Sequence, residues 1–259
     1  MKKSQQWNDL RDFLDEKADL YNRPDFIEAD PISIPHQFSK KEDVEIAAFL
    51  AATIAWGNRK SIVTNANRMM AIMDMCPHDF ILNHSAKDLK RTKGFVHRTF
   101  NEEDFRLFIQ SLKRIYTEHD GLEHVFSMGF ESGHAASFAI SYFRKTFFGE
   151  LQNSRTFKHV SDPESGSSAK RLNMFLRWMV RNDKKGVDFG LWNTISPAQL
   201  SIPLDVHTGN IARKLEILKR PQNDQKAVAE LDSVLRRLDK NDPVKYDFAL
   251  FGLGAIEKF

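Results

Sequence analysis

The sequence has almost none of the residues from which covalent and metal-bound scaffolds are built. One of its 259 residues is a cysteine, Cys76, which excludes a disulfide framework, a cysteine-rich zinc module and a cysteine-ligated iron–sulfur cluster. The nine histidines show no metal-ligand spacing, and the motifs of zinc proteases, P-loop proteins, serine hydrolases and dinucleotide-binding folds are missing. We therefore expect neither a bound metal nor a cofactor.

Long hydrophobic runs are missing as well. No stretch approaches the roughly twenty apolar residues of a membrane-spanning helix, and no apolar run follows the initial Met1. The sequence therefore predicts a cytoplasmic protein with no membrane partner. Its excess of positive charge is small, because 38 Lys and Arg face 35 Asp and Glu, and a net charge of +3 excludes a histone-like polycation.

Apolar and aromatic side chains, in contrast, are plentiful. Hydrophobic residues make up 41% of the chain, and 21 Phe, 4 Tyr and 4 Trp supply large side chains for a core. This composition excludes a largely disordered chain. A chain of this length is expected to form one large domain or two closely packed ones.

The apolar residues recur with helical spacing along nearly the whole chain. Residues 44–56 are apolar on all sides, which predicts a buried helix. A helix is also predicted over residues 243–251, with Gly252 and Gly254 ending it. Because no run of alternating β-branched residues is present, the predicted fold class is all-α.

Basic side chains gather in two segments. Residues 155–185 hold eight basic and three acidic residues, a local charge of +5, and residues 87–98 hold five basic and one acidic residue, a local charge of +4. Such segments on a nearly neutral chain are typical of a face that binds an anionic partner. Solvated loops and helix surfaces explain the same pattern equally well.

The longer basic segment contains a polar loop, residues 161–169, that leads directly into a helix predicted to begin at Lys170. The buried stripe of this helix consists of Leu172, Phe175, Leu176 and Met179. The opposite, outward side carries Lys170, Met174, Arg177 and Arg181. In the first turn, Lys170 lies against the positive end of the helix dipole and beside Arg171, and both favour the neutral amine that a nucleophile needs. The alternative is an ordinary surface lysine.

A second segment, residues 202–218, places Asp205 where another helix should begin. An N-cap role alone explains an aspartate at this position. An aspartate that accepts helix N–H groups is also held ionised, which suits a carboxylate that stabilises developing positive charge. His207, on the same helix, is either a phosphate ligand or a structural residue.

The sequence IPLDVHTGNIARKL resembles the segment that carries the catalytic aspartate in the helix-hairpin-helix–GPD superfamily of base-excision DNA glycosylases. Upstream, GSSAK resembles the end of that superfamily's hairpin, with Ser168 in place of a glycine. The resemblance implies that Lys170 is the Schiff-base nucleophile and Asp205 the catalytic aspartate. It also implies that Gly166 and Ser168 belong to a hairpin that binds the DNA backbone.

The 35 residues between Lys170 and Asp205 make the archaeal 8-oxoguanine DNA glycosylase branch the most similar one. KYDFALFGLGA resembles a motif of that branch in which an aspartate and an aromatic residue help to hold the flipped base. The resemblance implies that Asp247 bonds the base and that Phe251 stacks on it. Met174 occupies the place of the opposing aromatic residue.

EIAAFLAATIAWGNRKSIVTNANRMM resembles the superfamily's early helix pair, whose connecting loop inserts a polar side chain into the vacated base stack. Asn58 is the candidate for that insertion. Four further side chains are then expected along the DNA backbone, namely Arg171, Arg177, Arg181 and His207.

For the architecture we expect two interleaved helical subdomains with a cleft between them. The first combines residues 1–43 and 161–259 and carries the helix-hairpin-helix-like element with the catalytic residues, and the second is residues 44–160. The expected partner is double-stranded DNA containing a damaged base, bound by a monomer. Over its whole length the chain also resembles a bacterial family of conserved, uncharacterised proteins, through MFLRWMVR, IPLDVHTG and YDFALFGLG.

These expectations favour a DNA glycosylase with lyase activity on an oxidised purine such as 8-oxoguanine. Lys184 and Lys185 are weaker nucleophile candidates than Lys170, because they follow the predicted helix rather than a hairpin. Two alternatives stay open: a nucleic-acid-binding protein that keeps the fold without the chemistry, and a helical protein-interaction module. A single catalytic site requires the side chains of Lys170 and Asp205 to lie within about 10 Å of each other.

Overall fold

The computed structural model describes residues 2–28, 30–131, 135–150 and 155–259. Helices predominate in this part of the chain and strands are limited to one short hairpin, which confirms the predicted all-α class. The α-helices are α1 (Lys2–Tyr21), α2 (Lys41–Thr53), α3 (Arg59–Ile72), α4 (Pro77–Asn83), α5 (Ala86–Leu89), α6 (Glu102–Glu118), α7 (Leu122–Phe130), α8 (Ala136–Phe148), α9 (Lys170–Val180), α10 (Val206–Lys214), α11 (Gln225–Leu238) and α12 (Tyr246–Gly252).

Shorter elements connect these helices. Strands β1 (Val96–His97) and β2 (Phe100–Asn101) form a small antiparallel hairpin. The 3-10 helices are Pro24–Phe26, Pro31–Ser33, Pro35–Gln37, Lys90–Thr92, Arg155–His159, Pro197–Gln199 and Pro243–Lys245. Among the described residues, no helix combines the length and the apolar character that a membrane span requires.

Several helices begin at a side chain that accepts hydrogen bonds from their first amides. Such N-caps contribute about 1 kcal/mol each, because they satisfy amides that have no partner within the helix. Among the described α-helices, caps of this kind are formed by Asn58 for α3, Ser85 for α5, Asn101 for α6, Asp205 for α10 and Asp224 for α11.

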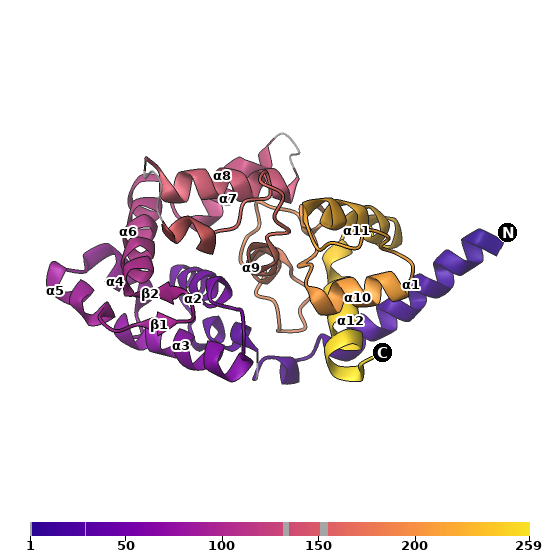
Figure 1. Cartoon of the computed structure of the whole chain (residues 1–259), viewed down its shortest axis with the longest axis horizontal. Helices are drawn as coiled ribbons and strands as arrows, with labels where there is room; N and C mark the ends of the chain where they lie inside the picture. The colour runs from indigo at the N-terminus through magenta and orange to yellow at the C-terminus, as the bar shows by residue number, and fades with distance from the viewer. Residues whose placement is uncertain (1, 29, 132–134, 151–154) are drawn as a thin grey trace.

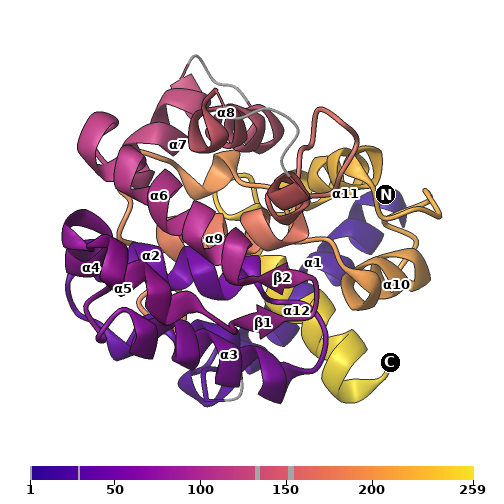
Figure 2. The same ribbon diagram turned by 60° about the vertical axis from the view of Figure 1, so that its left-hand side comes forward.

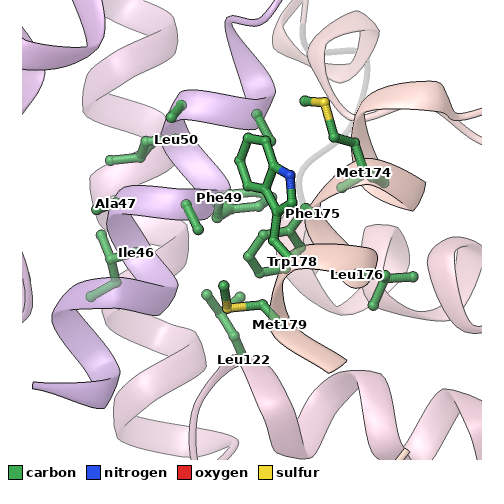
Figure 3. Packing of buried hydrophobic residues seen from close by; sticks show 14 of the residues in the cluster. Ile46, Ala47, Phe49, Leu50, Leu122, Met174, Phe175, Leu176, Trp178 and Met179 are labelled. Carbon is green, nitrogen blue, oxygen red and sulfur yellow. The ribbon is translucent and has the colours of Figure 1, made fainter. Parts of the chain in front are cut away.

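Helix α9 runs through the middle of the molecule (Figure 1). Every residue of α9 from Leu172 to Val180 is buried. One side of it packs on α2, whose residues Val44–Thr53 are also all buried, as the apolar segment 44–56 predicts. Figure 3 shows Phe49 of α2 against the Phe175 ring of α9, and the two ring centroids are 5.7 Å apart. Helix α9, whose first residue is Lys170, is therefore held in place by packing in the core.

The buried apolar side chains form two clusters. The larger one joins α2–α4, α6–α9 and, through Phe248, α12. The smaller one joins α1, α10, α11 and α12, and α1 lies alongside α12 in both views (Figure 1, Figure 2). Lys170, at the start of α9, and Asp205, at the start of α10, therefore belong to helices that pack in different clusters. The division of the chain into subdomains at residues 43 and 160 stays a prediction.

The C-terminal helix continues further than predicted. After α12, residues Leu253–Glu257 form a π-helix, so Gly252 and Gly254 do not end the helical segment. Gly252 has helical φ and ψ angles of −61° and −46°, and a Cβ atom at this position would collide with the ring of Tyr21 on α1. A Cβ atom on Gly254 would lie 3.1 Å from the Cβ atom of His207 on α10. These glycines therefore allow α1 and α10 to approach the C-terminal helix closely.

Candidate active site

A cavity of about 240 Å³ lies where α9, α10 and α12 approach the start of α3. All five side chains that the sequence assigned to catalysis or base binding line this cavity, namely Lys170, Met174, Asp205, Asp247 and Phe251. They come from three helices that are distant in sequence. The fold thus brings them into one site.

Lys170 is the first residue of α9, as predicted, and follows Ala169, which has a left-handed backbone with φ of 45°. Its Nζ atom lies 3.9 Å from Oδ2 of Asp205 and 3.8 Å from Sδ of Met174. The side chain of Lys170 is 30% exposed, so a molecule in the cavity can reach the amine. The two side chains satisfy the distance that a single site requires, about 10 Å at most.

Asp205 is the N-cap of α10, which confirms that part of the prediction. Its Oδ1 atom accepts a hydrogen bond from the Thr208 N–H at 2.9 Å. The other oxygen, Oδ2, is the atom that faces Lys170. One carboxylate therefore caps a helix with one oxygen and presents the second oxygen to an amine in the cavity.

Asp247 lies on α12, nine-tenths buried, and forms an ion pair with Arg177 of α9. Burial raises the pKa of Asp247 to about 6, although the charges of Arg177 and Lys170 act in the opposite direction. Burial would lower the pKa of Arg177, but the charges of Asp188 and Asp247 outweigh it and raise that pKa. Arg177 therefore stays charged, while Asp247 titrates close to neutral pH.

The prediction that Arg177 and Arg181 face outward is wrong. Each is only 4% exposed, because residues 183–192 and α12 cover the side of α9 opposite its apolar stripe. Nε of Arg177 lies 3.2 Å from Asp188, and Arg181 lies 3.2 Å from Asp188, 2.8 Å from Asp183 and 2.8 Å from Asp242. These acidic partners neutralise the two arginines inside the protein, so neither reaches a DNA phosphate.

Arg171 is also turned inward, against the prediction of a phosphate ligand. Its guanidinium donates hydrogen bonds to the carbonyl oxygens of Thr53 and His159, and it lies 4.7 Å from the ring centroid of Trp56. Burial lowers the pKa of Arg171 to about 10. Arg171 thus joins the end of α2 to α9 and holds Trp56 at the cavity wall.

The loop before Lys170 is built differently from a free phosphate-binding hairpin. It follows a 3-10 helix, Arg155–His159. Gly166 has a φ of 92°, which favours glycine, but its carbonyl oxygen accepts a hydrogen bond from Gln225 N–H at 3.0 Å. The Ser168 carbonyl oxygen accepts from the Asn173 side chain at 3.0 Å. Internal bonds therefore fix both residues.

Asn58 and His207 lie at the surface near the cavity. The side chain of Asn58 accepts a hydrogen bond from Ser61 N–H at 3.1 Å, so its oxygen caps α3. Insertion into DNA would compete with this bond. The ring of His207 is exposed on α10 and its centroid is 6.1 Å from that of Phe251. His207 is thus placed at the edge of the aromatic wall.

Other cavity residues were not identified from the sequence. Phe26, Trp56 and Phe248 add aromatic surface to Phe251, and Arg59 lies 5.8 Å from the Phe251 ring centroid. Asp30 caps a 3-10 helix by accepting from Ile32 N–H at 3.1 Å, and burial raises its pKa. The Asp30–Pro31 pair signals a turn, but no local pattern places that turn at a cavity.

The cavity combines flat apolar walls with balanced charges. Among its described lining residues, the cations are Arg59, Lys170 and Arg177, and the acids are Asp30, Asp205 and Asp247. Aromatic walls favour a planar ligand, and buried carboxylates accept hydrogen bonds from its N–H groups. An amine beside a carboxylate can supply a nucleophile together with an acceptor for its proton. No group of three or more His, Cys, Asp or Glu side chains suited to a metal ion occurs among the described residues.

Comparison with known proteins gives one match. A family model described as "Protein of unknown function (DUF2400)" matches residues 30–256, which is most of the chain. No curated protein and no solved structure matches the chain. Apart from Phe26, the residues that line the cavity lie within the matched segment.

Proposed function

We propose that this chain, which belongs to the DUF2400 family, is a DNA glycosylase with lyase activity that removes an oxidised purine such as 8-oxoguanine. The observation that carries the proposal is the 3.9 Å approach of Lys170 Nζ to Asp205 Oδ2 inside a cavity with aromatic walls. A lysine at the start of a helix, a partly exposed amine and an adjacent carboxylate are what imine chemistry on a sugar requires.

In this reaction the amine of Lys170 attacks the anomeric carbon of the damaged nucleotide, and the bond from that carbon to the base breaks. Asp205 has one of two roles: it accepts the proton that Lys170 releases, or it stays ionised and offsets the positive charge that develops on the sugar. The base leaves with the electron pair of the broken bond and takes up a proton. Opening of the sugar ring gives an imine on Lys170, and β-elimination then cleaves the 3′ phosphate bond.

The cavity would hold the base after it leaves the helical stack. Flipping costs a few kcal/mol, roughly, and costs least for a weakened base pair. Phe251 and Met174 would contact the two faces of the base, and Asp247 would accept hydrogen bonds from its N–H groups. An oxidised guanine fits this role because it carries N–H donors on both of its edges.

The DNA backbone would lie on the rim of the cavity rather than on α9. Arg59 lines the cavity, and Arg59, its neighbour Lys60 and Arg98 are all exposed. The guanidinium of Arg98, in the turn of the β1–β2 hairpin, lies against Gly57, which lines the cavity. These cations would bind phosphates on either side of the flipped nucleotide, with an affinity that depends strongly on salt.

A second candidate is a nucleic-acid-binding protein that keeps this fold without the chemistry. Two observations favour it. Ser168 occurs where a hairpin glycine is expected, and the Gly166 N–H already donates to the Pro163 carbonyl oxygen at 2.9 Å. Both features restrict the approach of a phosphate to the loop before Lys170.

Borohydride trapping on duplexes that carry 8-oxoguanine or an abasic site tests the proposal. We expect a covalent adduct with the wild type and with Lys184→Ala and Lys185→Ala, and none with Lys170→Ala. An adduct that persists in Lys170→Ala would assign the nucleophile to another amine. DNA binding without any adduct on either duplex would select the second candidate, and no binding at low salt would exclude both.

A further inference from the structure

The loop between α10 and α11 forms hydrogen bonds to the backbone of Asp205 and to the backbone of the loop before Lys170. Its residue Asn223 reaches Asp205: the side-chain Nδ2 donates to the Asp205 carbonyl oxygen at 3.0 Å. The same carbonyl oxygen also accepts the helical hydrogen bond from Gly209 N–H at 2.9 Å. Because that bond already satisfies the carbonyl, the bond from Asn223 acts as an additional restraint on the residue that carries the carboxylate.

Asn223 is itself held in one orientation. Its Oδ1 atom accepts a hydrogen bond from Nη2 of Arg213 at 2.6 Å, and Nε of Arg213 donates to the Arg220 carbonyl oxygen at 2.8 Å. A Cβ atom at Gly209 would lie 2.6 Å from Oδ1 of Asn223, so only glycine leaves room for this arrangement. These contacts explain why Gly209 and Arg213 occur in the helix that begins at Asp205.

The next two residues reach the loop before Lys170. Gln225 N–H donates to the Gly166 carbonyl oxygen at 3.0 Å, and Asp224 forms an isolated antiparallel bridge with Ser167. Asp224 is fixed in turn as the N-cap of α11, where it accepts from Ala227 N–H at 3.1 Å, and by an ion pair with Arg220. Residues 223–225, which we call the clasp, therefore connect the two segments that carry the amine and the carboxylate.

We propose that the clasp sets the separation of Lys170 from Asp205 and that Asn223 is a positioning residue for the Asp205 carboxylate. This inference rests on the proposed function, because positioning has a meaning only where the two groups react together. Lys170 and Asp205 lie on helices that pack in different hydrophobic clusters, and α12 contributes residues to both clusters, so neither cluster contains both helices. The clasp adds a direct connection between the two segments to the packing of α12, and a displacement of about 1 Å can slow a reaction by about a hundredfold.

Asn223→Asp in the full-length protein tests the proposal. Aspartate has the size of asparagine and keeps an oxygen for Arg213, but it replaces the donor to the Asp205 carbonyl with an acceptor. We expect borohydride trapping on an abasic-site duplex under single-turnover conditions to slow by a factor of about ten to a hundred. Binding of the same duplex without borohydride should keep its wild-type Kd, because Asn223 lies outside the cavity lining.

The same substitution in an Asp205→Asn background separates positioning from a general structural effect. If Asn223 acts only through Asp205, Asn223→Asp should cause no further slowing once the carboxylate is gone. The matched control is Asn101→Asp, because Oδ1 of Asn101, like that of Asn223, accepts a hydrogen bond from an arginine, in this case Arg155 at 2.9 Å. We expect the control to trap DNA at the wild-type rate.

The possible failures can be told apart. A wild-type protein that gives no adduct would overturn the proposed function, and with it the role of the clasp. A wild-type adduct together with a normal rate in Asn223→Asp, or an equal slowing in both backgrounds, would overturn the clasp alone. Should Asn223→Asp not fold, Asn223→Ser is too short to reach the Asp205 carbonyl, and the same rates are expected of it.

Discussion

Oδ2 of Asp205 lies 3.9 Å from Nζ of Lys170, while Oδ1 of the same carboxylate accepts the hydrogen bond that caps α10. The structural role and the proposed chemical role of Asp205 therefore fall on different oxygens. A substitution that keeps one oxygen and removes the charge can separate the two roles.

Asp205→Asn should leave stability nearly unchanged and slow imine formation. Asparagine caps helices about as well as aspartate, so we expect the free energy of unfolding to change by less than about 0.5 kcal/mol, whereas Asp205→Ala should lose about 1 kcal/mol. Both variants should slow borohydride trapping by about a hundredfold or more, because both remove the proton acceptor. Urea unfolding and trapping rates measure the two effects, and a wild-type rate in Asp205→Asn would restrict this residue to capping.

Asp188→Asn should destabilise the protein strongly. The side chain of Asp188 is fully buried and binds both Arg177 and Arg181, so its loss leaves two cations in the core with less compensation. Breaking a buried ion pair by removing one partner costs about 3–5 kcal/mol. Chemical denaturation measures the loss. In the control Asp74→Asn, the exposed pair with Arg91 breaks, and we expect no measurable change in stability. Equal stabilities of the two variants would contradict the interpretation.

The buried arginines show where sequence analysis of the fold reaches its limit. Helical spacing predicted the all-α class and the buried helix at residues 44–56, because such spacing is a local property of the chain. It also placed Arg177 and Arg181 opposite an apolar stripe, but it could not show that Asp188 and other acids distant in sequence cover that side. A charged stripe on a helix indicates exposure only when no other element packs on it.

The candidate site likewise contains residues that could be predicted from the sequence and residues that could not. Lys170, Asp205 and Asp247 could be predicted because each lies in a segment that resembles a known motif, and the structure places all three in one cavity. Asp30 and Trp56 could not, because their position at the cavity follows from tertiary packing alone. The Asn223 contacts also join residues that are distant in sequence, so local spacing gives no sign of them.

The raised pKa of Asp247 predicts a pH-dependent stability difference between the wild type and Asp247→Asn. With a pKa of about 6 in the folded protein against an ordinary 3.8, the folded state binds this proton more tightly than the unfolded state. The contribution of this proton to stability is complete below about pH 3.8 and is lost as the pH rises through about 6. The wild type should therefore gain about 2 kcal/mol relative to the variant between pH 7 and pH 4. Denaturation at several pH values measures this difference, and a constant difference would contradict it.

Arg98→Ala should weaken DNA binding and reduce its dependence on salt. Arg98 is exposed in the β1–β2 turn against Gly57 at the cavity rim, where the proposed function places a phosphate. Removing one phosphate contact should lower the slope of log affinity against log salt concentration by about one, with similar losses for different sequences. Titrations from about 50 to 200 mM salt measure the slope. The control is Arg237→Ala, which should leave the slope unchanged. The Arg237 guanidinium lies outside the cavity lining, 4.2 Å from the centroid of the Trp7 ring. If both variants keep the wild-type slope, the DNA backbone does not pass over the β1–β2 turn; if both lower it equally, the binding is spread over the surface rather than centred on the cavity.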